Sequence, residues 1–395
     1  MRIPSDNKPG YELARAVEPE IASNYIAHTY VADPEADALM LKLAHLAPFE
    51  MRQLLQAAMD DDQDGLKQAP AALRDFFDGM TPPDWVNPSE FPAGVRMFHR
   101  NSKVILASFV SGVLIEGFMT NISKSFFITG RVRDQGVRRL QQNNRHLVEC
   151  FLPGGLERYG DGWKLSVRIR LIHAQIRRLL GESDEWDADA WGVPLSSAHL
   201  GFAITAFSAR LLAHMRRLGA SYSEEEAESF MAAWRYVGWL MGIPETILFR
   251  DEAEALKLFE IGGICEPEPG IESIAMANSL VNSAPLLADM TDPTVRQAFA
   301  KYIYGVSRAV IGNKLAEQLN YPPTSTIGVL AWFRIQQRYE RLMRNTTLRK
   351  LPLLSRIDRG MYDQFAGLIQ VSAFDEAGIS YALPDHVYNE QSSKW

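Results

Sequence analysis

The residues best suited to chemistry lie on two helical segments that a glycine-rich loop separates. On the second segment, His173 lies on a partly apolar helix face beside Ile169 and Ile176. Arg170 precedes it by three positions and Arg177 follows it by four, so both guanidinium groups flank the imidazole on one side of the helix. If that face is buried, the two arginines need anionic partners, because an unpaired buried cation is costly.

Two kinds of partner would satisfy this arrangement. Carboxylate side chains from elsewhere in the chain would pair with the arginines and leave His173 as a hydrogen-bonded core residue, the usual role of a lone histidine on a helix. An iron porphyrin would use all three groups, since the imidazole can bind the iron while the guanidiniums pair with the propionates. Spacing alone leaves both open.

The first helical segment, predicted over residues 137–152, carries a polar stripe. Its members recur at positions i, i+3, i+4 and i+7 and are Arg139, Gln142, Asn143 and His146. Such a stripe is usually a solvent face. The breakers at 153–155 and 160–162 predict a short loop before the second helix, so the two helices are expected to pack side by side. A stripe that faced the His173 helix would instead be the polar wall of a pocket.

Helical signals also dominate the rest of the chain that must position these two segments. The segment 223–241 opens with a capping box of Ser223 and Glu226. Asp292 and Pro293 are typical of the start of another helix. Few segments alternate apolar and polar residues, and no Asn-Gly or Asp-Gly turn separates alternating apolar runs as a hairpin would. The sequence therefore predicts an all-α fold.

Composition indicates a globular protein with a sizeable core. The chain has 395 residues, of which 47% are hydrophobic and 23% charged, and its net charge is −7 without a basic arm. That balance argues against non-specific nucleic-acid binding. Four prolines within residues 81–92 mark the best boundary. We expect an N-terminal helical region over 1–94, a main domain over 95–345 and a C-terminal extension over 346–395.

Several familiar site and targeting signals are missing from the sequence. Neither cysteine lies in a CxxC or CxxCH pattern, which argues against a thiolate metal site or covalently attached haem and favours a reducing compartment. Nucleotide-binding glycine loops, HExxH and GxSxG are absent. No apolar signal-peptide region opens the sequence, and no segment reads as a bilayer span. We therefore expect a cytoplasmic protein.

A longer pattern around the two segments resembles a known family. Its residues are Arg139-Leu140-x-x-Asn143, then Pro153-Gly154-Gly155, Trp163, and Val167-Arg168-Ile169-Arg170-Leu171-Ile172-His173-Ala174-x-x-Arg177. This pattern resembles the MpaB-like/rubber oxygenase catalytic domain (DUF2236), whose best-understood members are the latex clearing proteins. Thr205 within AITAFS, and Trp234-Arg235-x-x-Gly238 followed by Met241-Gly242-Ile243-Pro244, agree with it. The resemblance covers roughly residues 95–330.

The resemblance implies an all-helical, globin-like fold around a non-covalent b-type haem, with O2 as co-substrate. The family's proximal haem ligand falls on His173, its following arginine on Arg177 and its distal-helix arginine on Arg139. Thr205 matches a further pocket threonine. Two departures stand out, because the distal lysine and threonine of the rubber-cleaving enzymes fall on Gln142 and Asn143. Losing the lysine removes a potential distal ligand and general base, which makes polyisoprene a poor substrate guess.

The expectation drawn from these residues is an O2-dependent oxygenase that cleaves a carbon–carbon double bond in a small, apolar, prenyl-like substrate. The expected site residues are His173 on the iron, Arg170 and Arg177 on the propionates, and Arg139, Gln142, Asn143 and Thr205 around the oxygen. A sensor or electron-transfer protein is the first alternative, and it would gain support if His146 were a second iron ligand. A haem-free domain that keeps only the fold is the second. The sequence leaves the oligomeric state open.

Overall fold

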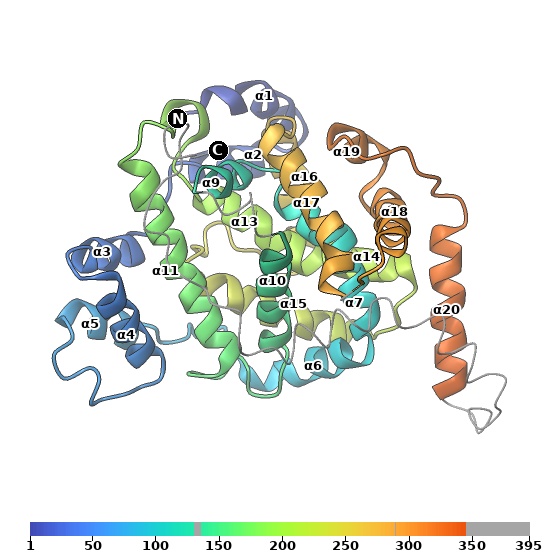
Figure 1. Cartoon of the computed structure of the whole chain (residues 1–395). Coiled ribbons are helices and arrows are strands. Elements are labelled where there is room, and N and C mark those ends of the chain that lie inside the picture. The colour runs from blue at the N-terminus through green and yellow to red at the C-terminus, as the bar shows by residue number, and fades with distance from the viewer. Residues whose placement is uncertain (130–135, 289, 345–395) are drawn as a thin grey trace.

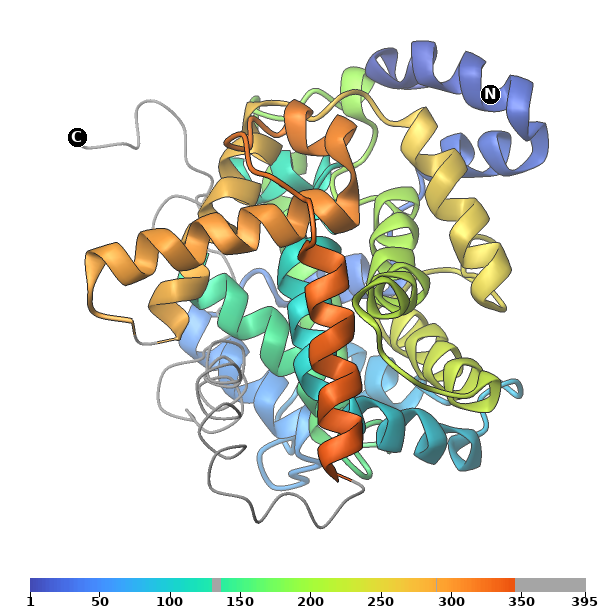
Figure 2. The same ribbon diagram turned by 90° about the vertical axis from the view of Figure 1, so that its right-hand side faces the viewer.

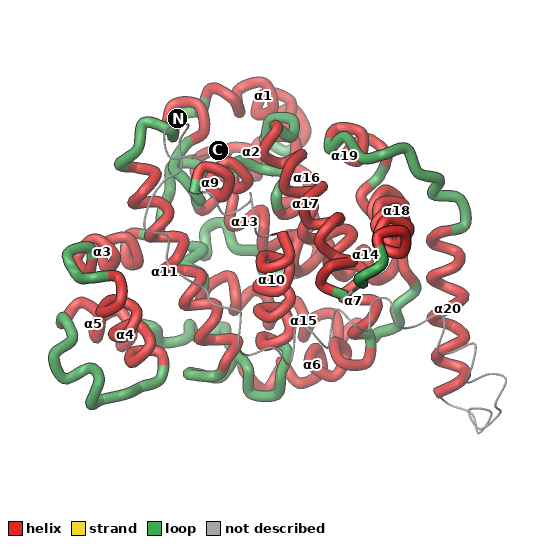
Figure 3. Tube along the Cα trace, in the orientation of Figure 1, coloured by secondary structure: helices red, strands yellow, loops and turns green. Residues whose placement is uncertain are grey.

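Every regular element in the described part of the chain is helical. The computed structural model describes residues 1–129, 136–288 and 290–344, and the predicted C-terminal extension lies outside these residues. Within them the trace consists of helices and loops without strands (Figure 3). The prediction of an all-α fold is confirmed.

The helices fall into three consecutive groups along the chain. The N-terminal group is η1 Ser5–Asn7, α1 Lys8–Val17, α2 Pro19–His28, α3 Pro34–Leu43, α4 Pro48–Met59 and α5 Ala71–Asp78. The middle group is η2 Pro88–Glu90, α6 Phe91–Arg100, α7 Ser102–Ser108, η3 Phe109–Val113, α8 Leu114–Gly117, α9 Ile122–Ile128, α10 Gly136–Cys150, α11 Asp161–Gly181 and α12 Ala188–Trp191. The last group is α13 Ser197–Thr205, η4 Ala206–Arg210, α14 Leu211–Leu218, α15 Glu224–Leu240, α16 Glu252–Cys265, α17 Ile271–Leu287, α18 Pro293–Ile311, α19 Asn313–Gln318 and α20 Val329–Arg344.

The two segments singled out in the sequence form α10 and α11, which pack side by side as predicted (Figure 1). Gly162, at the start of α11, makes the close approach possible. A Cβ atom at this position would lie 2.6 Å from the Cα of Cys150 at the end of α10. Glycine is therefore required where the second helix begins against the last turn of the first.

The predicted helix starts are also present. The Ser223 hydroxyl accepts a hydrogen bond from the backbone N–H of Glu226, and the Glu226 carboxylate accepts one from the Ser223 N–H, so α15 opens with the full capping box. Asp292 accepts hydrogen bonds from two backbone N–H groups in the first turn of α18. Both helix starts are satisfied locally, as the sequence predicted.

Two π-helical segments, η3 and η4, interrupt otherwise continuous helices in the core. η3 joins α7 to α8, η4 joins α13 to α14, and the two segments contact each other. Phe109 of η3 meets Phe207 of η4 edge to face, with ring centroids 5.4 Å apart. A wide π turn shifts the side chains that follow it around the helix, and such turns occur frequently at functional sites.

The N-terminal helices pack against helices of the middle and last groups. α1 and α2 pack against α16, while α3 packs along α11. Figure 1 shows α3, α4 and α5 gathered beside α11. On the other side of the molecule, α20 lies across the outside of the bundle against α14 and α18 (Figure 2).

Among the described residues, no single helix has the length and apolarity needed to cross a membrane. One pair, Ser102–Gly117 with Ile122–Ile128, meets those criteria only when taken together across a bend of 87°.

Candidate functional site

A narrow, mostly apolar cavity lies between α10, α11, α13 and α15. Its empty space is about 900 Å³ with the mouth included. Its described lining residues are Gly117, Phe118, Ile122, Phe126, Gln142, Asn143, His146, Ile169, Ile172, His173, Leu195, Leu200, Ala203, Ile204, Phe207, Trp234, Met241 and Ile243. No lysine or arginine is among these described residues.

α11 gives the cavity its histidine. His173 is buried, with 7% of its surface exposed, and it lines the cavity together with Ile169 and Ile172. At about 100° per residue these isoleucines lie on one side of His173, while Arg170 and Arg177 lie on the other. The side of α11 that carries His173 and the two isoleucines thus faces the cavity, and the side that carries the two arginines faces away from it.

α10 contributes the polar part of the wall. Gln142, Asn143 and His146 all line the cavity, so the stripe singled out in the sequence faces the same space as His173. The structure thereby brings together four of the residues considered above. The side chain of the fifth, Arg139, lies outside the described part of the structure.

His146 is held by a hydrogen-bond chain that fixes its tautomer. The Ser166 hydroxyl donates to the carbonyl oxygen of Gly162 at 2.7 Å, so His146 Nε2, 2.9 Å away, must donate to the Ser166 oxygen. Burial lowers the pKa of His146 to about 4. The imidazole is therefore neutral near pH 7, with its proton on Nε2 and its lone pair on Nδ1.

Arg170 and Arg177 point to carboxylates of the N-terminal region and do not line the cavity. The Arg170 guanidinium donates to both carboxylate oxygens of buried Asp33, at 2.6 and 2.8 Å, and to Glu35 at 2.8 Å. Arg177 donates to Asp37 at 2.8 and 3.1 Å. Both arginines thus have carboxylate partners, one of the two kinds that the spacing left open, and the propionate role stays a prediction.

The loop after α15 closes over the first of these ion pairs. Gly242 has a φ of +80°, and a Cβ atom there would lie 2.2 Å from Asp33 Oδ2 and 2.7 Å from Arg170 Nε. Its neighbours Met241 and Ile243 line the cavity. Only glycine fits where this loop crosses the ion pair, so the packing of Asp33 on Arg170 also sets one wall of the cavity.

Thr205 is placed differently from the expectation. It is fully buried on α13, and its hydroxyl donates to the Phe202 carbonyl oxygen at 2.6 Å within the same helix. It is not among the described lining residues. Its hydroxyl is thus hydrogen-bonded within α13, the helix that precedes the η4 turn.

A buried charged cluster behind the cavity was not anticipated from the sequence. Arg210 and His214 both donate to the Glu116 carboxylate, at distances of 3.0 Å for Arg210 Nε and 3.0 Å for His214 Nε2. Burial opposes ionisation, but His214 and Arg210 outweigh it and lower the pKa of Glu116 to about 2. The sequence signal for this cluster was Glu116 itself, a lone acid directly after the uncharged run 104–115.

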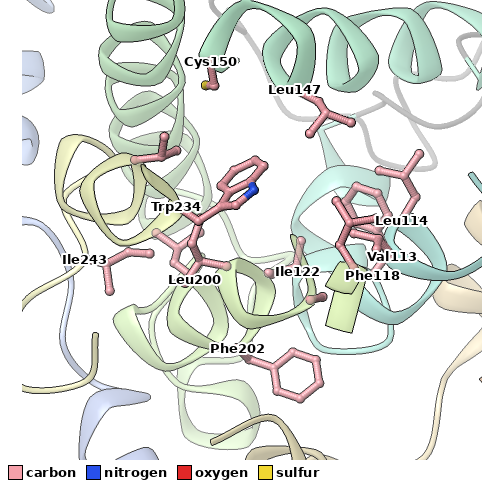
Figure 4. Close-up of a cluster of buried hydrophobic side chains, with 14 of the residues drawn as sticks. Val113, Leu114, Phe118, Ile122, Leu147, Cys150, Leu200, Phe202, Trp234 and Ile243 are labelled. Atoms are coloured by element: carbon pink, nitrogen blue, oxygen red, sulfur yellow. The ribbon is translucent and has the colours of Figure 1, made fainter. Parts of the chain in front are cut away.

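Trp234 is the cavity residue whose role sequence reasoning missed. It is fully buried on α15, within a cluster of apolar side chains that includes Leu200, Ile243, Ile122 and Phe118 (Figure 4). Its helical spacing marked it only as a core residue. Its indole N–H on the cavity wall is a polar group that the spacing could not reveal.

These features define a class of all-helical proteins that carry an imidazole on the wall of an apolar cavity. Residues 96–345 match the family described as "ER-bound oxygenase mpaB/B'/Rubber oxygenase, catalytic domain". The chain belongs to this family of oxygenases, which confirms the resemblance seen in the sequence.

Two relatives agree with this assignment. The chain is 22% identical over 290 residues to the Rubber oxygenase of Streptomyces sp. (strain K30), a match that covers 70% of this chain and 69% of the relative. It is also similar in fold to the solved structure of Latex Clearing Protein LCP in the closed state. That similarity has a TM-score of 0.72 at 16% identity and covers 90% of this chain and 95% of the other.

Proposed function

We propose that this chain is a haem b-dependent oxygenase that uses O2 to cleave a carbon–carbon double bond in a small, apolar substrate of prenyl type. The observation that carries the proposal is the buried His173 imidazole on the wall of a narrow apolar cavity, in company with the neutral amides of Gln142 and Asn143. Membership in an oxygenase family supports the reaction class.

The residues present fit a haem. A single imidazole is a common protein ligand of haem iron, and a narrow cavity with apolar walls suits a flat, largely apolar ring. His173 would hold the group from α11. When bound, the haem supplies the iron chemistry by which O2 is activated.

The remaining cavity residues would bind and orient the oxygen and the substrate, and they would do so as uncharged groups. The Asn143 amide offers N–H donors that do not titrate, so it can hydrogen-bond an oxygen atom at any ordinary pH, and the Gln142 amide beside it on the same wall is equally uncharged. Phenyl rings of Phe118, Phe126 and Phe207 would hold a hydrocarbon substrate and exclude water. Arg170 and Arg177 act at a distance, because their ion pairs to the N-terminal region fix α11 and with it His173.

The proposed reaction balances without a further reductant. One O2 adds to one alkene, the carbon–carbon double bond breaks, and each of its two carbons becomes a carbonyl carbon. One relative is named Rubber oxygenase, and rubber is a polymer that contains prenyl-type double bonds. We propose the same type of bond in a smaller molecule, since an uncharged Gln142 stands where the rubber-cleaving members have a lysine.

A haem sensor or electron-transfer protein is the second candidate, because His146 lines the same cavity as His173. The hydrogen bond to Ser166 occupies His146 Nε2 and leaves only Nδ1 to bind a metal. Ligation through Nε2 would require breaking that bond. The hydrogen-bond chain therefore favours the oxygenase, which needs an open side of the haem.

The proposal is tested by the visible spectrum and by product analysis. The purified chain, expressed with added haem, should show a Soret band and a five-coordinate ferrous form. Incubation with 2-methylhept-2-ene and O2 should yield acetone and pentanal in equal amounts. A six-coordinate ferrous spectrum without these products would replace the oxygenase by the sensor.

The matched variants are His173→Ala and His99→Ala. His173→Ala should abolish the Soret band, whereas His99→Ala removes an exposed imidazole outside the cavity and should leave it unchanged. Full haem occupancy in His173→Ala would overturn the assignment of the ligand.

A further inference from the structure

Trp234 presents an unsatisfied hydrogen-bond donor to the cavity. The side chain is 0% exposed and lines the cavity, and its Nε1–H has no acceptor among the described residues. Most buried indole N–H groups have an acceptor, because burying a bare donor costs stability. A donor kept on the wall of a cavity in this way indicates that the acceptor arrives with the ligand.

The indole is fixed in place by its neighbours. Its ring centroid lies 6.0 Å from that of Phe151, 5.6 Å from Phe207 and 6.4 Å from Phe230. In Figure 4 the indole reaches into the centre of the apolar cluster, and its nitrogen faces the space on the side of Phe118 and Ile122. Both of these residues line the cavity. The donor is therefore held rigidly at the cavity, without an acceptor among the described residues.

The surroundings of the indole select a neutral acceptor. Three phenyl rings pack near it, and the cavity has no lysine or arginine among its described lining residues. The His146 imidazole lies at a centroid distance of 6.2 Å, and burial keeps it neutral by lowering its pKa to about 4. A carboxylate placed here would lack a compensating cation, so an uncharged oxygen fits better.

We infer that the Trp234 indole N–H binds a neutral oxygen, such as a ketone carbonyl, on an otherwise apolar ligand of this cavity. The inference rests on the proposed function only for the prenyl nature of the ligand. It makes Trp234 a specificity-determining residue that distinguishes an oxygenated prenyl compound from a pure hydrocarbon.

The test uses two ligands of the same shape. 6-Methylhept-5-en-2-one and 2,6-dimethylhepta-1,5-diene differ only in that a ketone oxygen replaces a methylene group. Dissociation constants are measured by calorimetry on the full chain as isolated, for the wild type and for Trp234→Phe. The variant should weaken ketone binding about fivefold, the size of one neutral hydrogen bond, and leave diene binding unchanged.

Trp163→Phe is the matched control. Trp163 is also a fully buried indole, but it lies outside the cavity and its side chain is hydrogen-bonded to Tyr236. This variant should leave the ketone-to-diene preference at the wild-type value. An equal loss for both ligands in Trp234→Phe, no loss for either, or no binding of either ligand to the wild type would overturn the inference.

A second measurement does not depend on any variant being well folded. In wild-type protein labelled with ¹⁵N-tryptophan, and with any haem held in the diamagnetic ferrous carbonmonoxy state, the ketone should move one indole N–H resonance downfield. The diene should not. Absence of that shift at saturating ketone would contradict the inference.

The two proposals can fail separately. A ketone-dependent shift in a chain that takes up no haem, or forms no products, would refute the oxygenase and keep the Trp234 donor. Alkene cleavage without any preference for the ketone would keep the oxygenase and refute the role of the Trp234 donor.

Discussion

The two edges of α11 use opposite kinds of chemistry. Toward the cavity the helix presents His173 together with Ile169 and Ile172, with no charged side chain among the described lining residues. Toward α3 it presents Arg170 and Arg177, each paired with a carboxylate. The charges so prominent in the sequence therefore hold the helix in place, while the candidate site is built from neutral groups.

Removing an acid from the charged edge should give the largest effect on stability. Asp33→Ala leaves the buried Arg170 guanidinium without its bidentate partner and should lower the free energy of unfolding by about 3–5 kcal/mol. Urea denaturation measures the loss. Glu35→Ala is the control, because the Glu35 side chain is 76% exposed and its ion pair is expected to contribute less than about 1 kcal/mol. Equal losses in the two variants would remove the distinction between buried and exposed partners.

The neutral wall that α10 contributes to the cavity should affect how stability depends on pH. His146 titrates near 6.5 when unfolded, but burial lowers its pKa to about 4 in the folded chain. The unfolded state therefore binds the proton first, so this contribution is complete above pH 6.5 and is lost as the pH falls toward 4. By linkage the loss amounts to roughly 3 kcal/mol.

His146→Gln isolates that contribution. The variant should have a flatter stability curve between pH 6.5 and 4 in urea titrations. The Glu116 pKa, lowered to about 2 against a normal 4.5, gives a separate loss between pH 4.5 and 2 that both proteins should share. An unchanged slope in the upper window would show that the imidazole is not buried in neutral form.

A smaller effect is expected from the amide wall. Asn143→Ala should retain haem and change the O2 dissociation rate about fivefold, because one neutral hydrogen bond is removed. Stopped-flow mixing of the reduced protein with O2 measures that rate. Gln141→Ala, on the same helix but outside the cavity lining, should match the wild type. If both variants changed the rate alike, α10 would act through its packing rather than through the Asn143 amide.

The smallest effect is expected at Thr205. Its hydroxyl bonds within α13, so Thr205→Val should cost no more than about 1.5 kcal/mol in unfolding free energy and leave haem uptake unaltered. Chemical denaturation and the Soret absorbance check the two parts. Loss of haem in this variant would restore Thr205 to the cavity, where the family resemblance had placed it.

Local patterns predicted the helices and one wall of the site. The spacing of the α10 stripe, the breakers before α11 and the capping box of α15 each depend on residues within one or two turns, and all three are present in the structure. The joint cavity of His173, Gln142 and Asn143 follows from the side-by-side packing of two helices joined by a short loop.

Long-range partners could not be predicted in the same way. Periodicity shows which side of α11 Arg170 occupies, but nothing local names Asp33, 137 positions earlier, as its partner. The Trp234 donor was hidden for a different reason, because apolar spacing reports that a ring is buried and not which way its N–H points. These are properties of the assembled fold rather than of any one segment.

The ion pairs on α11 also join the domain that matches the family to residues that precede it in the chain. The family match begins at residue 96, yet Arg170 and Arg177 depend on Asp33 and Asp37. A fragment that begins at residue 96 would keep the described cavity-lining residues but would leave Arg170 and Arg177 without Asp33 and Asp37. The carboxylates that hold the histidine helix therefore come from a part of the chain that lies before the matched domain.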